Sequence, residues 1–282
     1  MIGKDKALLS FIKNSIQEDI GDGDHSSLAC IPVKTMGKMH LLIKQQGIIA
    51  GIDIAEKIYA YADPQLVLKR KMNDGENVKA GDIAFLAEGP VHSLLKTERL
   101  VLNIMQRMSG IATETRKYTD KIAGTHTKIL DTRKTTPGFR MLEKLAVKTG
   151  GGENHRMGLY DMIMLKDNHI DFSGGIEAAI RKTNEYLKKT GKKLKIEVEA
   201  RSMGEVREIL DAGGINRILL DNFTPEETKQ AVKMINGRYE TESSGMITLK
   251  NLAEYAQAGV DFISIGALTH QIKSLDMSLK AI

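Results

Sequence analysis

Cysteine, tryptophan and long apolar runs are scarce in this chain, and each shortage excludes a class of protein. Among the 282 residues there is one cysteine and no tryptophan. The single thiol, Cys30, excludes an intramolecular disulfide and a cysteine-rich zinc site. No apolar run is long enough to cross a bilayer, and the N-terminus lacks the apolar core of a signal peptide. We therefore expect a soluble cytoplasmic protein with no membrane partner.

Aromatic side chains make up only 5% of the chain, so the sequence does not single out nucleic acid as its partner. The 41 lysines and arginines exceed the 36 acidic residues and give a net charge of +5. Basic and acidic residues are interspersed, whereas nucleic-acid-binding proteins gather basic residues in a patch or stripe. The net charge by itself fits phosphate ligands, nucleic acid or plain solubility equally well.

The chain up to residue 110 has the pattern of a small α+β domain. Apolar residues at helical spacing predict a helix over 7–20. Short apolar stretches broken by glycines then predict a mostly antiparallel sheet with a short helix inside it. The strands are expected at 39–43, 47–51, 66–68 and 83–86, the short helix at 55–61, and a strong amphipathic helix at 94–111.

From residue 114 onward, helical and strand-like patterns alternate regularly. The helices are predicted at 114–123, 140–148, 176–189, 203–212, 225–235 and 249–258. The strands are predicted at 128–131, 162–166, 194–199, 217–221, 238–242 and 262–266. This rhythm favours a parallel (β/α) barrel over a doubly wound open sheet. We predict two domains, 1–110 and 111–282.

The stretch from Ile129 to Ile170 gathers basic residues around two strand-like runs. The first run breaks into Arg133 and Lys134, and the second breaks into Lys166. A glycine-rich loop between them carries His155 and Arg156. Bringing these cations together is electrostatically costly unless a strongly anionic ligand binds there. His155 fits either a positioned donor to that ligand or a supporting role.

Polar or small residues also end the later strands, as they do in barrels whose active site is built at that face. Glu199 and Asp221 end strands that are otherwise rich in apolar residues, where a lone carboxylate is penalised. Two such carboxylates can hold Mg²⁺. The pairs Ser244-Gly245 and Gly266-Ala267 offer backbone N–H groups to a phosphate. We predict one shared site, in which the cations hold a carboxylate-rich partner or a pyrophosphate.

The segment DTRKTTPGFRMLEKLAVKTGGGENHRMGLYDMIMLKDNHI (131–170) resembles the signature of the quinolinate phosphoribosyltransferase family, also called nicotinate-nucleotide pyrophosphorylase (carboxylating). The resemblance extends along nearly the whole chain. Further blocks occur in order, namely EDIGDGDHSS, TERLVLNIMQRMSGIAT, IEVEA, ILLDNFTPE, ESSGMITLKNL and ISIGALTH. It implies an N-terminal α/β sandwich domain followed by an incomplete parallel (β/α) barrel, assembled as a homodimer.

The resemblance also implies a reaction and a role for each site residue. Quinolinate and phosphoribosyl pyrophosphate react with Mg²⁺ to give nicotinate mononucleotide, pyrophosphate and CO₂, a step of NAD biosynthesis. The quinolinate carboxylates are expected at Arg133, His155, Arg156 and Lys166, with Thr132 beside them and Arg99 reaching in from the partner subunit. The ribose and Mg-pyrophosphate are expected at Lys134, Glu199 and Asp221, and the 5′-phosphate at Ser244, Gly245, Gly266 and Ala267.

One position departs from the family pattern, and two alternative functions stay open. Met246 stands after Ser244-Gly245, where the family commonly has another glycine, and its side chain is expected to narrow the loop. A molybdenum-transport-associated relative shares the barrel, but the intact NHR (154–156) and KDNHI (166–170) argue against it. A basic RNA-binding or carrier module is favoured only by the charge and by the turn at 73–83, which is similar to that of biotinyl and lipoyl carriers. Such a module leaves Glu199 and Asp221 without a purpose, so we expect no nucleic-acid partner.

Overall fold

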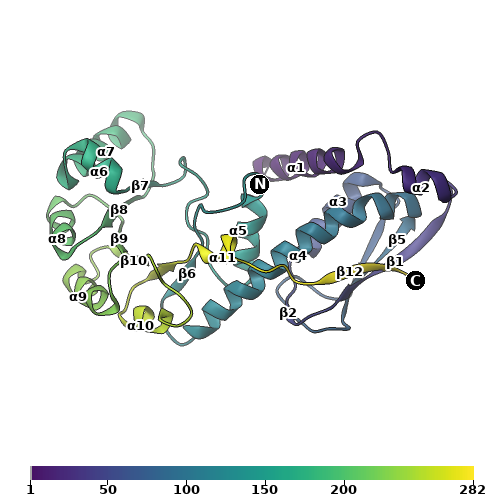
Figure 1. The fold of residues 1–282 in the computed structure, drawn as a ribbon. Coiled ribbons are helices and arrows are strands. Elements are labelled where there is room, and N and C mark those ends of the chain that lie inside the picture. Colours follow the sequence, from purple (N-terminus) through teal and green to yellow (C-terminus); the bar gives the residue numbers. More distant parts are fainter. Residues whose placement is uncertain (1) are drawn as a thin grey trace. The chain divides into compact units, whose positions relative to one another are not determined.

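The computed structural model describes residues 2–282, with side chains from residue 6 onward. The chain forms two compact units. The first unit comprises Met1–Glu114, Pro137–Gly150 and Gln271–Ile282, and the second comprises Thr115–Thr136 and Gly151–His270. Figure 1 shows the elements of both units along the chain. None of the helices in the described part is both long and apolar enough to span a membrane.

A four-stranded antiparallel sheet forms the centre of the first unit. Its strand order is β12-β1-β5-β3, with β1 at Met36–Ile43, β3 at Val67–Arg70, β5 at Ile83–Pro90 and β12 at Met277–Ala281. A two-stranded ribbon joins β2 (Gly47–Ile48) to β4 (Asn77–Val78). The helices are α1 (Ile2–Ile20), α2 (His25–Cys30), α3 (Ile52–Ala62) and α5 (Arg140–Thr149). Leu41, Ile58 and Phe85 are fully buried and mark the core of this unit.

A single long helix, α4, spans Val91–Lys121, where the sequence pattern predicted two helices with a break near residue 112. Gly110 lies inside this helix. A side chain at this position would collide with the backbone carbonyl of Lys273. The glycine therefore serves the close approach of the C-terminal segment and does not end the helix.

The C-terminal segment supplies β12, a strand that the sequence pattern did not predict. This strand pairs along β1 from Met39↔Ala281 to Ile43↔Met277. Two hydrogen bonds with α4 also fix the segment: the Leu275 N–H donates to the Gln106 carbonyl (2.9 Å), and the Gln106 side chain donates to the Met277 carbonyl (3.0 Å). Residues 271–282 thus belong to the first unit, whereas the sequence pattern divided the chain once, at 110.

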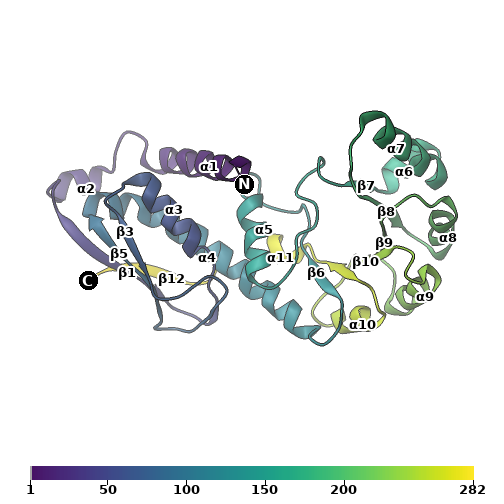
Figure 2. The same ribbon diagram turned by 180° about the vertical axis from the view of Figure 1, so that it is seen from behind.

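Six parallel strands form the second unit in the order β6-β11-β10-β9-β8-β7. Their bounds are Lys128–Leu130 for β6, Ile163–Leu165 for β7, Ile196–Ala200 for β8, Arg217–Asp221 for β9, Glu240–Ser244 for β10 and Phe262–Ser264 for β11. The helices α6 (Asp167–Ser173), α7 (Ile176–Thr190), α8 (Met203–Ala212), α9 (Pro225–Ile235), α10 (Leu252–Gln257) and α11 (Ala267–His270) follow their strands. Figures 1 and 2 show α7, α8 and α9 along the outer side of this sheet.

The sheet confirms the predicted incomplete barrel. The first two strands of this unit in chain order, β6 and β7, form the two edges of the sheet, and no ladder joins them in the described residues. A single parallel bridge from Leu130 to Glu153 extends the β6 edge. Because all six strands run in one direction, their carboxyl ends share one rim, at which the predicted site residues are placed.

The two faces of the sheet differ in polarity, because side chains alternate along a strand. Val198, Ile218 and Leu220 are fully buried and lie on the face covered by the helices. The opposite face carries acidic and basic side chains, including Glu197, Glu199, Arg217, Asp221, Glu240 and Glu242. The interior of the open barrel is therefore charged, and its charges lie beneath the rim.

Candidate active site

A lysine and two carboxylates occupy neighbouring strand ends at the rim. Lys166, which directly follows β7, places its Nζ atom 3.2 Å from Oε2 of Glu199 on β8. Asp221 at the end of β9 lies within electrostatic range of both groups. Burial, and then the charge of Glu199, raise the pKa of Asp221 above its ordinary value. The structure thus brings together three side chains from three predicted strand ends.

Two guanidinium groups lie close together after β6. Arg133 is exposed, and Arg156 on the neighbouring loop is partly buried. Burial, and then the charge of Arg133, lower the pKa of Arg156. The Arg156 Nη1 atom also donates to the Met162 carbonyl at 3.3 Å, which holds the side chain in place. An anion with carboxylates would relieve the repulsion between the two guanidiniums, since arginine binds carboxylates in a two-point fork.

The loop after β10 adopts left-handed backbone at two successive positions. Gly245 has a φ of +92° and Met246 a φ of +48°. A side chain at position 245 would collide with the Asn222 amide, so this glycine is required for close packing with the loop after β9. The Asn222 N–H donates to the Ser244 carbonyl (2.8 Å) and ties the two loops together.

Met246 adopts a left-handed backbone conformation, in a region that L-residues rarely occupy. Its side chain is 81% exposed and so does not fill the loop. The Met246 carbonyl accepts a hydrogen bond from the Asn251 amide (3.3 Å). The expected narrowing of the loop by this side chain is therefore not seen.

The loop after β11 lies against the segment after β6. A side chain at Gly266 would contact the aliphatic part of Lys134 and the ring of His270, each at 3.1 Å. The Thr269 hydroxyl donates to the Lys134 carbonyl at 2.7 Å, and the Lys134 N–H donates to the Thr132 hydroxyl at 3.0 Å. Ala267 begins α11 beside Gly266. Lys134, Thr132, Gly266 and Ala267 therefore form one wall of the rim.

Beneath the rim lies a buried charged group, which we call the inner cluster: His155, Glu197, Glu242 and Arg217. The His155 Nε2 atom is 2.9 Å from Oε2 of Glu197 and 3.4 Å from Oε2 of Glu242. The Arg217 Nη1 atom is 2.7 Å from the same Glu242 oxygen. Both glutamates are fully buried. Charges buried this deeply are tolerated only because they are paired.

The inner cluster shifts the titration of its members. Burial disfavours the imidazolium form of His155, but the two glutamates outweigh burial and raise the pKa of His155 to about 9. Burial, and then the charge of Glu242, raise the pKa of Glu197. Burial also favours the neutral form of Glu242, yet His155 and Arg217 outweigh burial and lower its pKa. Glu242 is therefore ionised, and Glu197 is the more easily protonated of the two.

Two groups of side chains could hold a metal ion: a pair of carboxylates at the rim, and a histidine with two glutamates in the inner cluster. Glu199 and Asp221 are neighbours at the rim, and burial together with the charge of Glu199 raises the pKa of Asp221. Their oxygen atoms are the donors that Mg²⁺ prefers. The other group is His155, Glu197 and Glu242, whose ligand atoms all lie within 4.8 Å of one another.

Arg99 is the one predicted site residue that lies in the first unit. It is exposed on α4. All the other predicted site residues belong to the second unit. A role for Arg99 in the site of a partner subunit stays a prediction.

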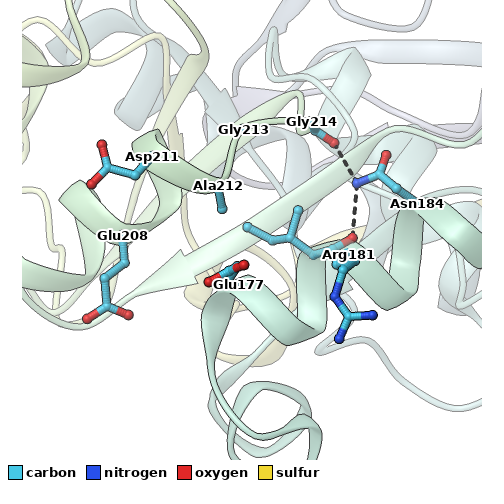
Figure 3. Close-up of a pocket in the computed structure, with 9 residues that line it drawn as sticks. Glu177, Arg181, Asn184, Glu208, Asp211, Ala212, Gly213 and Gly214 are labelled. Atoms are coloured by element: carbon cyan, nitrogen blue, oxygen red, sulfur yellow. Dashed lines mark hydrogen bonds between the residues drawn. The ribbon is translucent and has the colours of Figure 1, made fainter.

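A cavity of about 670 Å³ lies away from the rim. Figure 3 shows that α7 and α8 border it, with Arg181 and Asn184 on α7 and Glu208 and Asp211 on α8. The Asn184 amide donates to the Gly214 carbonyl (3.1 Å), in the loop that leads into the amino end of β9. No predicted site residue lines this cavity. Its size therefore carries no argument about catalysis.

Sequence reasoning missed the acidic members of the inner cluster. Glu197 stands two residues before Glu199 in the stretch IEVEA, and Glu242 two residues before Ser244. The signal that could have found them is the strand period of two, because a residue two positions before a rim residue lies on the same face of the sheet.

Comparison with known proteins gives matches over nearly the whole chain. The family model described as "Quinolinate phosphoribosyl transferase, C-terminal domain" matches residues 111–280. The corresponding model for the N-terminal domain of that family matches residues 24–109. The two models thus cover both predicted domains.

Relatives with curated names are 41–45% identical to this chain. Quinolinate phosphoribosyltransferase [decarboxylating] 1b of Nicotiana tabacum is 44% identical, covering 97% of this chain and 82% of its own length. The "Probable nicotinate-nucleotide pyrophosphorylase [carboxylating]" of Bacillus subtilis is 41% identical, covering 96% of this chain and 92% of its own length. Some plant relatives carry "mitochondrial" or "chloroplastic" in their names.

Solved structures agree in fold along the same length. NadC from Streptococcus pyogenes matches with a TM-score of 0.90 and 36% identity, covering 96% of this chain and 95% of its own. The nicotinate-nucleotide pyrophosphorylase of Francisella tularensis matches with a TM-score of 0.91 and 35% identity, covering 98% and 96%. These matches support the predicted fold class, which combines a small-sheet domain with an open parallel barrel.

Proposed function

Because this chain belongs to the quinolinate phosphoribosyltransferase family, we propose that it transfers the phosphoribosyl group of phosphoribosyl pyrophosphate to quinolinate. The products are nicotinate mononucleotide, pyrophosphate and CO₂, and the reaction belongs to NAD biosynthesis. One observation carries this proposal: a pair of neighbouring guanidiniums and a pair of neighbouring carboxylates share one rim, with Lys166 in contact with Glu199. Two anionic substrates, one of them bound with a cation, complement that charge pattern.

The basic side chains bind and orient quinolinate. Arg133 and Arg156 supply planar donors for the two carboxylates, and Lys166 supplies a point charge. Fixing both carboxylates fixes the ring, so the pyridine nitrogen faces the ribose carbon that it attacks. Orientation of this kind converts an encounter between two substrates into a step within one complex.

The acidic side chains act at the ribose. The nitrogen lone pair forms a bond to the anomeric carbon while the bond to pyrophosphate breaks, and the ribose passes through an oxocarbenium-like state. The carboxylates of Glu199 and Asp221 favour this developing positive charge, and Lys134 favours the negative charge that leaves with pyrophosphate. Mg²⁺, when bound, would supply positive charge to the leaving pyrophosphate. We propose that Glu199 and Asp221 hold it, directly or through water.

Loss of CO₂ follows from the first step. N-ribosylation makes the ring a pyridinium, which stabilises the electron pair left on the ring carbon when the adjacent carboxylate departs. A proton from water then replaces the carboxylate. The protein contributes by holding the intermediate in place, with no residue required to form a covalent bond.

Incubating the purified protein with quinolinate, phosphoribosyl pyrophosphate and Mg²⁺ tests the proposal. We expect CO₂ and nicotinate mononucleotide in equal amounts, and we expect excess EDTA to abolish both. Omitting quinolinate is the matched control. Failure to form the mononucleotide at any Mg²⁺ concentration would overturn the assignment, and turnover in EDTA would overturn the role of the metal.

Replacing Arg133 with alanine should separate the two substrates. We expect the KM for quinolinate to rise about tenfold to a hundredfold, because a bidentate charged contact is lost. The KM for phosphoribosyl pyrophosphate should stay within about twofold of wild type, since that substrate is assigned to other residues. Steady-state kinetics with each substrate varied in turn gives both values. An equal loss for both substrates contradicts the assigned roles.

We propose that the protein works as a homodimer and that Arg99 completes the site of the partner subunit. Arg99 is exposed on α4 and belongs to the first unit, whereas the other predicted site residues belong to the second unit, which supports the proposal. A cytoplasmic location is also proposed, and cell fractionation tests it.

A further inference from the structure

His155 has a protein group opposite each of its ring nitrogens. The backbone N–H of Arg156 donates to Nδ1 at 2.7 Å. On the other side, Nε2 lies 2.9 Å from Glu197 and 3.4 Å from Glu242. The His155 side chain is only 5% exposed. The ring thus points down into the inner cluster, while the backbone of the same segment carries Arg156 to the rim.

These contacts determine where the ring proton sits. A nitrogen that accepts a hydrogen bond carries no proton, so the neutral ring has its proton on Nε2. A second proton, favoured by the raised pKa described above, would go to Nδ1 and cost the bond from Arg156. In both charge states Nε2 is protonated and faces carboxylates. A protonated nitrogen has no lone pair for a metal, so the inner cluster does not fit a metal site.

Within the inner cluster, Glu197 is the partner that depends most on His155. Arg217 contacts Glu242 (2.7 Å) and Glu240 (3.0 Å). Among the described residues, Glu197 has no ion-pair partner besides His155. Neither Nε2 of His155 nor the two oxygens of Glu197 meets hydrogen-bond geometry with any partner in the described part of the chain, so we assign the contact from the 2.9 Å distance between Nε2 and Oε2. A buried carboxylate in this position strongly favours keeping the imidazole N–H beside it.

Hydrogen bonds to Asp131 also hold the segment that contains His155. The Asn154 amide and the His155 backbone N–H donate to the two oxygens of Asp131, at 2.5 Å and 2.9 Å. Asp131 is fully buried and directly follows β6. The loop that carries Arg156 is therefore held by a carboxylate at β6 and by a carboxylate at β8.

We propose that Glu197 is a positioning residue for quinolinate: its contact with Nε2, which is protonated in both charge states of the ring, fixes His155 and with it the adjoining Arg156. This inference rests on the proposed function, which places Arg156 at a quinolinate carboxylate.

Three variants test the role of Glu197 in catalysis. In Glu197→Leu the acceptor is lost, and we expect the KM for quinolinate to rise about tenfold or more while that for phosphoribosyl pyrophosphate stays within about twofold. Glu197→Gln keeps an acceptor oxygen and should restore most of the quinolinate affinity. Glu240→Gln is the matched control, because it removes a carboxylate from the same Arg217 network without touching His155, and it should leave both KM values within about twofold.

The outcomes separate this role from others. Equal damage from the leucine and glutamine variants would assign the effect to charge and overturn the hydrogen-bond role. An unchanged quinolinate KM in Glu197→Leu would overturn the proposal altogether. Equal rises in the two KM values would reduce Glu197 to a structural residue.

An NMR spectrum of the wild-type protein tests the same inference. It needs neither an activity measurement nor a variant protein. Long-range ¹H–¹⁵N correlation spectra distinguish the two neutral tautomers and the cation of histidine. We expect His155 to show a protonated Nε2 at neutral pH. A protonated Nδ1 with a bare Nε2 would overturn the proposal. If wild-type protein fails to use quinolinate, the proposed function fails, and the spectrum still decides the position of the proton.

Discussion

Replacing Asp221 with asparagine should nearly abolish turnover and at the same time make the free protein more stable. Turnover should fall about a hundredfold to a thousandfold, because a charge that favours the ribosyl transition state is removed. The thermal midpoint should rise, because burial and the neighbouring Glu199 already penalise the Asp221 carboxylate and raise its pKa. Lower turnover together with a higher thermal midpoint is the result expected for a residue that serves function at a cost in stability.

The sign of the stability change depends on pH. A carboxyl group whose pKa is higher in the folded state than in the unfolded state destabilises the fold wherever it is ionised. The cost is therefore present at neutral pH and disappears as the pH falls through the raised pKa of Asp221. Thermal melts of both proteins from pH 8 to pH 4, without Mg²⁺, should show the two midpoints converging at the acid end.

Glu227→Gln serves as the opposite control. The N–H and hydroxyl of Thr224 lower the pKa of Glu227 at the start of α9. Its ionised form therefore stabilises the fold, and the glutamine variant should melt earlier than wild type at neutral pH. A lower midpoint for Asp221→Asn, or turnover close to wild type, would contradict the assigned environment of Asp221.

The rim of the barrel could be predicted from the sequence because strand direction carries the information. In a parallel sheet every strand ends at the same edge, so the polar residues that follow Leu165, Leu220 and Ser243 must meet. The contact of Lys166 with Glu199 and the electrostatic influence of Glu199 on Asp221 confirm this part of the prediction. No knowledge of side-chain packing was needed.

The inner cluster escaped prediction for a different reason. Buried charges contradict the expectation that strand interiors are apolar, and only partners from other strands make them tolerable. Glu197 on β8, Arg217 on β9 and Glu242 on β10 become neighbours through the register of the sheet. The residue pattern within one strand does not show how neighbouring strands are aligned. Glu199 was therefore predicted from its place at a strand end, whereas Glu197, inside the strand, was not.

The C-terminal strand and the long helix were missed together. Residues 277–281 are too few and too weakly alternating to stand out, and Gly110 resembles a helix break. Their structure follows from contacts far apart in sequence, since β12 pairs with β1 and the segment before it packs on Gly110. Contacts of this range are invisible to local propensity.

Mixing two inactive variants should restore activity if Arg99 serves the partner's site. We expect Arg99→Ala and Asp221→Asn each to be almost inactive when expressed alone. Random assembly of equal amounts would give half mixed dimers, each with one intact site, because one subunit supplies Arg99 and the other supplies Asp221. Co-expression with two affinity tags should therefore recover about a quarter of the wild-type activity.

A pair of variants within the second unit provides the control for this mixture. Asp221→Asn and Glu199→Gln both damage the same barrel, so their mixed dimers contain no intact site and should stay inactive. If Arg99 acted on its own subunit, the first mixture would stay inactive as well. Recovery in the Arg99 mixture but not in the Glu199 mixture therefore requires that the arginine crosses to the partner, and it also requires that the working enzyme has at least two subunits.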